Sequence, residues 1–162
     1  MAAADYFLKL DGIPGESQDY KHKGEIDLES FAWGETNVAP GHGPGTGAGK
    51  VAMQDFHFTA RVNKASPALF LACATGKHIK EAILTARKAG KDQQDYLIIK
   101  LGDVLISSYQ IGGAEAAGDV PMDQVSFNFE KVQYEYRPQK PDGSLGAAIK
   151  AAFDVKKNKP GY

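Results

Sequence analysis

The chain has 162 residues and a formal net charge of −1 at pH 7, with 43% hydrophobic and 24% charged residues. Its length suits one domain, typically about 100–200 residues. A near-neutral chain argues against nucleic-acid binding, which depends on neutralising phosphates with Lys and Arg. No stretch approaches the roughly 18 apolar residues of a membrane-spanning helix. We therefore expect one domain over residues 1–162, with no nucleic-acid partner and no membrane insertion.

The first residues do not have the pattern of a secretory signal peptide. Residues 1–7 contain no basic segment followed by a long apolar one, and a signal peptide needs both. We expect the protein to begin in the cytosol. If it is exported, we expect a secretion route that does not depend on a signal peptide.

Two extended segments open the chain. Residues 5–11 alternate between large apolar and polar side chains, which is typical of a strand with one buried face. In residues 21–33 the large apolar residues form two sets of opposite parity, Ile26 with Leu28 and Phe31 with Trp33. One extra residue near Glu29–Ser30, a β-bulge, would bring both sets to one side. The alternative is that the two sets of side chains face opposite sides of the sheet.

Residues 34–50 have no core pattern, and glycine occupies every second position from 41 to 49. A loop longer than packing requires is usually functional or disordered. Its end, Gly49-Lys50, suggests a phosphate-binding loop, but that motif needs a glycine at 44 and a hydroxyl at 51. The chain has Pro44 and Val51 there, and a strand rather than a helix follows. A flexible contact loop is the favoured interpretation.

The next segment predicts a strand that leads into a short helix. Residues 51–62 alternate, with Phe56, Phe58, Ala60 and Val62 on one face. Ser66 is expected as N-cap, Pro67 as the first helical residue and Gly76 as the left-handed end. No residue from 68 to 74 is charged, so we expect a buried helix, with sheets that wrap around it or close against it.

This helix carries Cys73, the single cysteine of the chain. No intrachain disulfide can form, and a small core residue is the simplest interpretation of this side chain.

Residues 77–90 are ambiguous. Ile79, Ile83 and Ala86 have helical spacing and Gly90 could end a helix, yet the same residues also alternate as in a strand. Propensity alone favours a helix.

The C-terminal half reads as strands. Residues 95–111 form one, with a turn or a bend at Gly102–Asp103. Residues 124–137 form another, whose parity changes at a second bulge near Glu130–Lys131. A turn at 138–143, a last short strand at 153–156 and a tail at 158–162 follow. Bent strands with one short helix indicate a mainly β barrel or tight sandwich.

No pattern indicates a catalytic, cofactor or metal site. Asp55 and His57 share a strand face, but two ligands without a third are better read as a solvated face. The serines include no nucleophile elbow. Glu25, Asp27 and Glu29 share one face, which is more typical of a wet edge or a partner-facing patch than of an acid–base pair.

Motifs along most of the chain resemble one family, the haemolysin-coregulated proteins (Hcp), which are tube subunits of the bacterial type VI secretion system. The motifs are Tyr6-Phe7-Leu8-Lys9-Leu10-Asp11-Gly12-Ile13-Pro14-Gly15-Glu16-Ser17, the run from Ile26-Asp27 to Trp33-Gly34, Gly49-Lys50-Val51 with Gln54-Asp55-Phe56, Ser66-Pro67, Cys73-Ala74-Thr75-Gly76-Lys77-His78, Arg87-Lys88-Ala89-Gly90, Tyr96-Leu97-Ile98-Ile99, Phe127-Asn128-Phe129 and Tyr136-Arg137-Pro138-Gln139. No single motif is decisive, but their order and spacing are specific.

The resemblance implies a compact β-barrel of two antiparallel sheets, with one flanking helix at about Pro67–Thr75. It also implies that residues 82–90 form a strand, against propensity. It implies hexameric rings that stack into an expelled tube, whose lumen carries effectors. The partners would be other copies of the chain and the type VI sheath, spike and effector proteins. The protein would be no enzyme, would need no cofactor, and would pass from the bacterial cytoplasm to the outside or a target cell.

An inter-ring stacking role is expected for the glycine-rich loop, comprising Gly41, His42, Gly43, Pro44, Gly45, Thr46, Gly47, Ala48 and Gly49. Pro40, His42 and Pro44 set this loop apart from those of relatives. Because the chain ends about where the core ends, we expect a tube subunit without an appended toxin domain. A small-ligand barrel, for example for carbohydrate bound by Trp33 and tyrosines, is the alternative, and a hydrolase has the least support.

Overall fold

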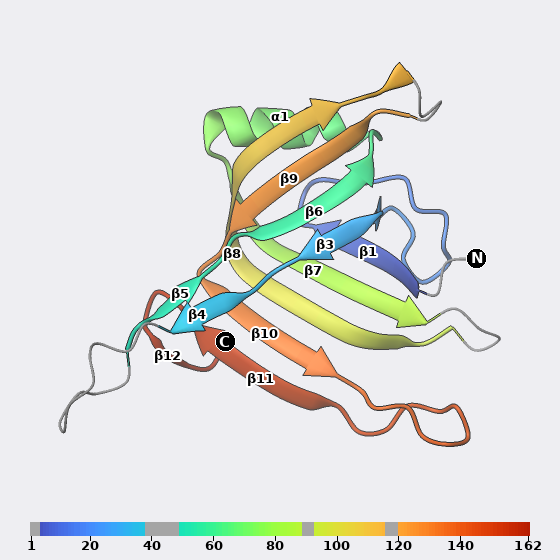
Figure 1. The fold of residues 1–162 in the computed structure, drawn as a ribbon. Helices are drawn as coiled ribbons and strands as arrows, with labels where there is room; N and C mark the ends of the chain where they lie inside the picture. The colour runs from blue at the N-terminus through green and yellow to red at the C-terminus, as the bar shows by residue number, and fades with distance from the viewer. Residues whose placement is uncertain (1–3, 38–48, 89–92, 116–119) are drawn as a thin grey trace.

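The structure is a computed structural model that describes residues 4–37, 49–88, 93–115 and 120–162. These residues form strands and one short helix (Figure 1). The strands are β1 (Ala4–Leu10), β2 (Ile26–Leu28), β3 (Ser30–Ala32), β4 (Glu35–Asn37), β5 (Val51–Met53), β6 (Phe56–Arg61), β7 (His78–Lys88), β8 (Asp95–Gly112), β9 (Met122–Asn128), β10 (Lys131–Tyr136), β11 (Ile149–Asp154) and β12 (Lys159–Pro160), and the helix is α1 (Ser66–Thr75). The mainly β class and the flanking helix are confirmed.

The long strand β8 organises the larger sheet. One edge of β8 pairs with β7, which continues to β1 and β2. The other edge pairs with β10 along its first half and with β9 along its second half. From β9 the sheet continues to β6 and β3, and from β10 to β11 and β12. A second sheet contains only β4 and β5.

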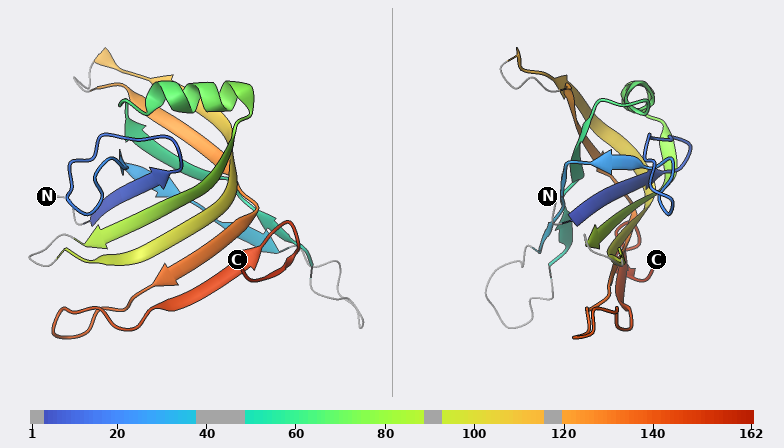
Figure 2. Two further views of the ribbon diagram at one scale, coloured as in Figure 1. Left: turned by 180° about the vertical axis from the view of Figure 1, so that it is seen from behind. Right: turned by 90° about the vertical axis from the view of Figure 1, so that its right-hand side faces the viewer.

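The two branches that begin at β7 and β9 curve towards each other to form the barrel. They end in β2 and β3, which are separated by Glu29 alone. The chain itself therefore crosses from one end of the curved sheet to the other, and the Glu29 N–H donates to the Thr59 carbonyl of β6 over 2.8 Å. The branch β10–β11–β12 does not join the barrel but extends from it (Figures 1 and 2). We call β10 and β11 the sheet arm.

Both predicted changes of parity occur. At Glu29 the strand breaks and changes its partner from β1 to β6. Ile26 and Leu28 before the break are buried, and Phe31 after it packs on the same core. The second break falls at residues 129–130, next to the predicted position. In each case the break keeps apolar side chains on one side of the sheet.

Aromatic rings fill the centre of the barrel. The side chains of Phe56, Phe58 and Phe127 are completely buried. Phe56 and Phe127 stack with their ring centroids 4.9 Å apart. This arrangement confirms the buried face predicted for residues 51–62, although the strand is interrupted between β5 and β6.

The helix that propensity favours for residues 77–90 is wrong. Residues 78–88 are strand β7, as the family resemblance implied, because both edges of this segment find partners in β1 and β8. Ladder pairing on two sides outweighs the weak intrinsic preference for a helix. Gly102–Asp103 is a bend within one strand, and Asp103 has a φ of 54°.

Three further segments are more ordered than predicted. Residues 35–37 of the expected loop form β4, which pairs with β5. The last long strand begins at Ile149 rather than at residue 153. The expected tail contains β12, which pairs with β11.

Helix α1 begins differently from the prediction. Pro67 lies in the first turn, at the second helical position rather than the first, and Gly76 ends the helix with a φ of 66°, as expected. Ser66 is not the N-cap, since Ala65 occupies that position. The Ser66 hydroxyl instead donates to the carboxylate of Asp123, which is fully buried. The Ser66 hydroxyl, which the local sequence assigned to capping, is thus bound by a carboxylate of β9.

A second hydroxyl completes this buried cluster. Tyr109 of β8 donates to Asp123 over 2.7 Å. Burial, followed by this hydrogen bond, raises the pKa of Tyr109 to about 12, so its hydroxyl remains a donor at ordinary pH. The cluster joins α1 to β8 and β9.

We expect Ser66→Ala to lower the free energy of unfolding by about 2 kcal/mol, because it removes a hydrogen bond and leaves an oxygen of the buried Asp123 carboxyl without this partner. Urea unfolding at low protein concentration measures this. The matched control is Thr75→Ala, since the Thr75 hydroxyl bonds only the Leu71 carbonyl at the exposed end of the same helix. Equal losses for the two variants would show that Asp123 does not anchor α1.

Candidate functional site

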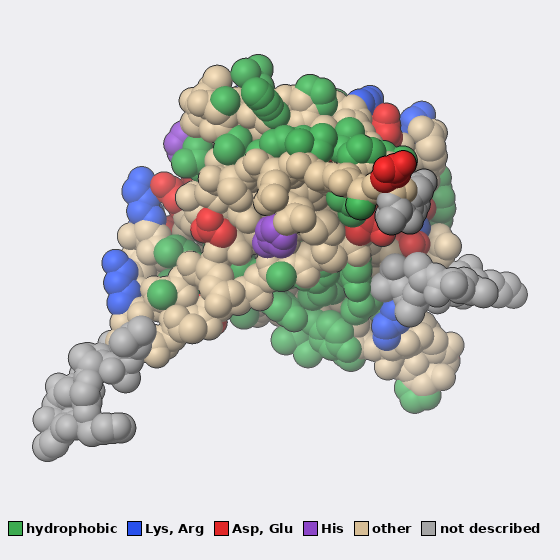
Figure 3. All heavy atoms as spheres, turned by 45° about the horizontal axis from the view of Figure 1, so that its top comes forward, with side chains coloured by type: hydrophobic (Ala, Val, Ile, Leu, Met, Phe, Trp, Pro, Cys, Tyr) green, Lys and Arg blue, Asp and Glu red, His purple; other side chains and the backbone are tan. Residues whose placement is uncertain are grey.

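One side of α1 is apolar and uncovered. Leu69 and Ala72 are buried against the sheet, but the side chains of Phe70 and Leu71 are 49% and 61% exposed. Contrary to what the sequence suggested, the helix is therefore not covered on most sides. The sheet closes against it, which was one of the two expected arrangements, but on one side only. Ile111, two residues beyond Tyr109 on β8, is 55% exposed. We call Phe70, Leu71 and Ile111 the helix surface, and Figure 3 shows hydrophobic side chains across the upper part of the molecule.

A second exposed apolar surface lies on the sheet arm. Tyr134 and Tyr136 of β10 and Ile149 of β11 are 43%, 39% and 64% exposed. Tyr136 is the cross-strand partner of Ile149, so the exposed side chains are neighbours. We call these three residues the sheet surface. The sheet arm and α1 lie at opposite ends of the molecule in every view (Figures 1 and 2).

A groove of about 410 Å³ adjoins the sheet surface. It lies between the β4–β5 pair and the sheet arm, and we call it the Trp33 groove. Its lining includes Trp33, Met53, Val132, Tyr134, Ala151 and Phe153, and among the described residues Glu35 is its one charged member. The Trp33 ring contacts the rings of Phe129 and Tyr134, with centroids 6.1 and 6.5 Å away. The buried Trp33 Nε1 has no hydrogen-bond acceptor among the described residues.

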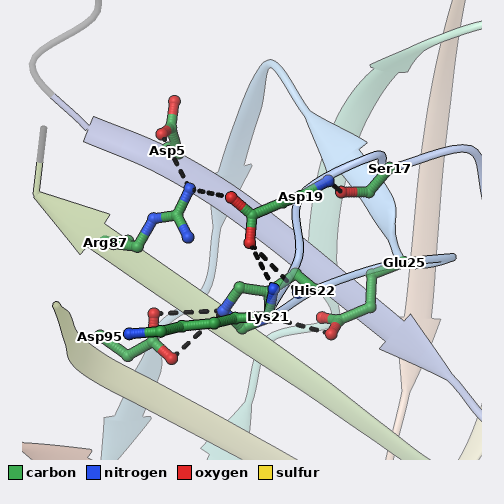
Figure 4. A network of polar contacts seen from close by, with 8 residues as sticks. All are labelled: Asp5, Ser17, Asp19, Lys21, His22, Glu25, Arg87 and Asp95. Atoms are coloured by element: carbon green, nitrogen blue, oxygen red, sulfur yellow. Dashed lines mark hydrogen bonds and ion pairs between the residues drawn. The ribbon is translucent and has the colours of Figure 1, made fainter. Parts of the chain in front are cut away.

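A network of buried charges holds the loop between β1 and β2 onto the barrel (Figure 4). Arg87 of β7 is buried, and its Nη2 donates to Asp19 over 2.6 Å and to Asp5 over 3.5 Å. The hydrogen bond from Arg87 lowers the pKa of Asp19 to about 2. The guanidinium also lies over the Phe7 ring, 4.9 Å from its centroid. A charge paired in this way stays ionised at ordinary pH.

His22 links the same loop to β8. Its ring stacks on Phe7 with a centroid distance of 4.4 Å. Its Nδ1 lies 2.9 Å from a Glu25 oxygen and its Nε2 lies 3.1 Å from an Asp95 oxygen. Burial by itself lowers the pKa of His22, but the hydrogen bonds and charges of Glu25 and Asp95 outweigh it. The net result is a pKa above the ordinary value of 6.5.

The acidic residues that the sequence placed on one strand face have separate roles. Glu25 binds His22, and Glu29 pairs with Arg61 over 3.2 Å at the exposed surface. Partial burial, followed by the charges of Asp5 and Asp19, raises the pKa of Asp27. The structure thus places two of them in ion pairs and the third beside other acids.

The two candidate metal ligands do not converge. Asp55 accepts a hydrogen bond from Ser107 over 2.6 Å, and His57 Nδ1 lies 2.9 Å from the Ser126 hydroxyl. Among the described residues, no group of three or more His, Cys, Asp or Glu side chains could hold a metal ion. These contacts fit the solvated strand face that the sequence favoured.

Most of the predicted stacking loop lies outside the described residues, which omit positions 38–48. Of the nine residues assigned to it, only Gly49 is described. The Asn37 side chain donates to the Gly49 carbonyl over 2.9 Å, next to the β4–β5 pair. The stacking role remains a prediction.

The comparisons with known proteins decide the family. The family profile described as “Type VI secretion system effector, Hcp” matches residues 7–136. The chain belongs to the Hcp family. It is 43% identical over 161 residues to protein Hcp1 of Pseudomonas aeruginosa, covering 96% of this chain and 98% of that protein. The resemblance inferred from sequence is confirmed, and the chain is a type VI secretion protein.

Solved structures agree with this assignment and with the fold. Hcp1 from Salmonella typhimurium is 36% identical, with a TM-score of 0.82 and coverage of 98% of this chain and 99% of that one. A structure described as a type six secretion system protein is 32% identical, with a TM-score of 0.93 and coverage of 98% and 100%. Across the part of this Hcp chain that is described, no helix is long and apolar enough to cross a membrane.

Sequence reasoning missed the buried ion network and the exposure of the helix. Arg87 and Asp19 are 68 positions apart, and His22 and Asp95 are 73 apart, so no local spacing marked either pair. The helix did carry a signal, namely the absence of charged residues from 68 to 74, but that pattern does not say what covers the segment.

We expect His22→Gln to lower the free energy of unfolding by about 2 kcal/mol, the order of one charge-assisted hydrogen bond. Because folding raises the pKa of His22, its stabilising effect is fully present below the ordinary value of 6.5 and is lost as the pH rises through the folded-state value. The difference from the unmodified protein is therefore largest in mild acid.

Urea unfolding from pH 5 to pH 9 measures this difference. The matched control is His78→Gln, because the His78 side chain is exposed on β7. A difference for His22→Gln that is constant across the range would show that the charge of the ring does not bind the loop.

Proposed function

We propose that this Hcp protein is a structural subunit of the type VI secretion inner tube, which forms hexameric rings that stack and carry effectors in their lumen. One observation supports the proposal most strongly, the presence of two unlike apolar surfaces at opposite ends of the folded molecule. Exposed apolar residues scattered singly need no explanation, but grouped ones mark interaction sites. Here they gather on the helix surface and the sheet surface.

Two unlike surfaces on one chain favour a head-to-tail contact. Such a contact generates a ring when the rotation between neighbours closes, and it leaves the ring with two different faces. Different faces suit stacking in one direction. The net charge of −1 leaves little repulsion between copies. The proposal needs no catalytic residue.

The role of the glycine-rich loop, the further partners and the export are proposed from membership of the Hcp family. The loop of Gly41 to Gly49 would lie on the next ring, and Gly49 is joined to the β4–β5 region through Asn37. The sheath, the spike and effectors would be further partners. The protein would leave the bacterial cytoplasm without a signal peptide.

The alternative of a small-ligand barrel has one observation in its favour, the Trp33 groove. Its volume of about 410 Å³ is within the usual range for ligand sites. Its lining is mostly apolar, whereas a sugar needs several hydrogen-bonding groups around its hydroxyls. The groove suits an apolar occupant better.

We expect the unmodified protein to form rings, and Leu71→Glu or Ile149→Lys to reduce assembly strongly, since each places a charge in one apolar surface. Size-exclusion chromatography with light scattering over a range of concentrations measures assembly, and electron microscopy shows ring shape. The control is Tyr20→Ser, because Tyr20 is 80% exposed and lies outside both surfaces. A protein that stays monomeric at every concentration would contradict the proposal.

We expect deletion of residues 41–49 to leave rings intact and to weaken their stacking, because the loop would contact the next ring. Electron micrographs of concentrated protein measure the proportion of rings in stacks. The control replaces the same residues with a glycine–serine segment of equal length, which keeps loop length and removes side-chain contacts. Loss of the rings themselves would assign the loop to contacts within a ring.

A further inference from the structure

We propose that α1 of one copy docks in the Trp33 groove of the next copy. The inference rests on the proposed ring and specifies which surfaces meet in it. It concerns an interface between copies of this chain.

The first argument is chemical match. Helix α1 contains no charged residue, and it presents Phe70 and Leu71 to water. The Trp33 groove is lined by Trp33, Met53 and Phe153 among other apolar residues. An apolar helix face in an apolar groove is a common mode of recognition. The sheet surface borders the groove through Tyr134, which belongs to both, and extends the apolar area available to the helix.

The second argument is charge. Lys64 precedes α1 and Lys77 follows it, and both side chains are exposed. The charged residue in the groove lining is Glu35, which is also exposed. A base beside an apolar helix and an acid beside an apolar groove are complementary. Such pairs contribute to recognition and association rate more than to affinity. Because a lysine lies at each end of the helix, they favour this contact without selecting the direction of the helix in the groove.

The third argument is position. The Asp123 cluster holds α1 against β8 and β9, at the end of the molecule opposite the sheet arm (Figure 2). The helix therefore cannot reach the groove of its own chain. A second copy can supply the helix, and each copy then offers, in its described part, one exposed helix face and one groove. That is the head-to-tail relation that a ring requires.

A cross-linking experiment tests the contact. In a Cys73→Ala background, which has no other cysteine, the chain carries Leu71→Cys and Ala151→Cys, both at exposed positions. A short thiol-to-thiol cross-linker is expected to give a ladder of covalent oligomers up to the closed ring on a denaturing gel. The control pair is Leu71→Cys with Ser107→Cys, since Ser107 is exposed on β8 and lies outside the groove.

Light scattering on the same samples separates the two proposals. Rings without a ladder for Leu71→Cys with Ala151→Cys would overturn the docking inference and leave the ring intact. Absence of rings from the unmodified protein at every concentration would overturn the proposed function itself. Dimers from Leu71→Cys alone would indicate a two-fold contact between helices, which also overturns the inference.

Tryptophan fluorescence gives a second readout that needs no cross-linker. Trp33 is the single tryptophan of the chain and lines the groove. We expect its emission to shift to longer wavelength as rings dissociate on dilution, because departure of the helix exposes it to water. Leu71→Glu is expected to show the shifted emission even at high concentration. Rings that dissociate with no change in emission would overturn the inference, as would a sugar that changes the emission of intact rings.

Discussion

The pairing of β8 with two strands along one edge is the constraint on which the rest of the structure depends. β9 takes the second half of that edge into the barrel, and β10 takes the first half into the sheet arm. The bend at Asp103, with its φ of 54°, lies between the two halves. Barrel and arm are thus one hydrogen-bonded unit, which fixes the helix surface relative to the Trp33 groove. In a closed ring the angle between neighbours is repeated at every contact, so a loose joint within the subunit would prevent closure.

The ion network likewise fixes the conformation of the loop between β1 and β2. Arg87 and His22, which are both buried, bind carboxylates from the loop, β1 and β8, of which Asp5 and Asp95 remain partly exposed. Buried ion pairs add little net stability, because desolvation offsets their attraction. Loss of one partner is costly, however, since it leaves a buried charge alone. The network therefore favours one loop conformation over others, and this loop covers Phe7 of β1 through the stacked His22 ring.

The sequence predicts best what depends on alternation within a strand. The opposite parities of Ile26 and Phe31 correctly located the break at which the chain changes strand partners. It predicts poorly what depends on a distant group. Ser66 looked like an N-cap because a serine before proline usually is one, but Asp123 binds its hydroxyl. Likewise β7 has helical spacing, and only its pairing with β1 and β8 makes it a strand.

The helix shows why an apolar pattern is an incomplete guide to a single chain. The uncharged residues 68–74 suggested a covered helix, but such a pattern does not say whether the covering atoms belong to the same polypeptide. In the structure the sheet covers Leu69 and leaves Leu71 61% exposed. A monomer would gain solubility by placing a charge at Leu71, and the chain has none there. In the proposed ring, the neighbouring copy would cover this face and so complete the core that this chain leaves open.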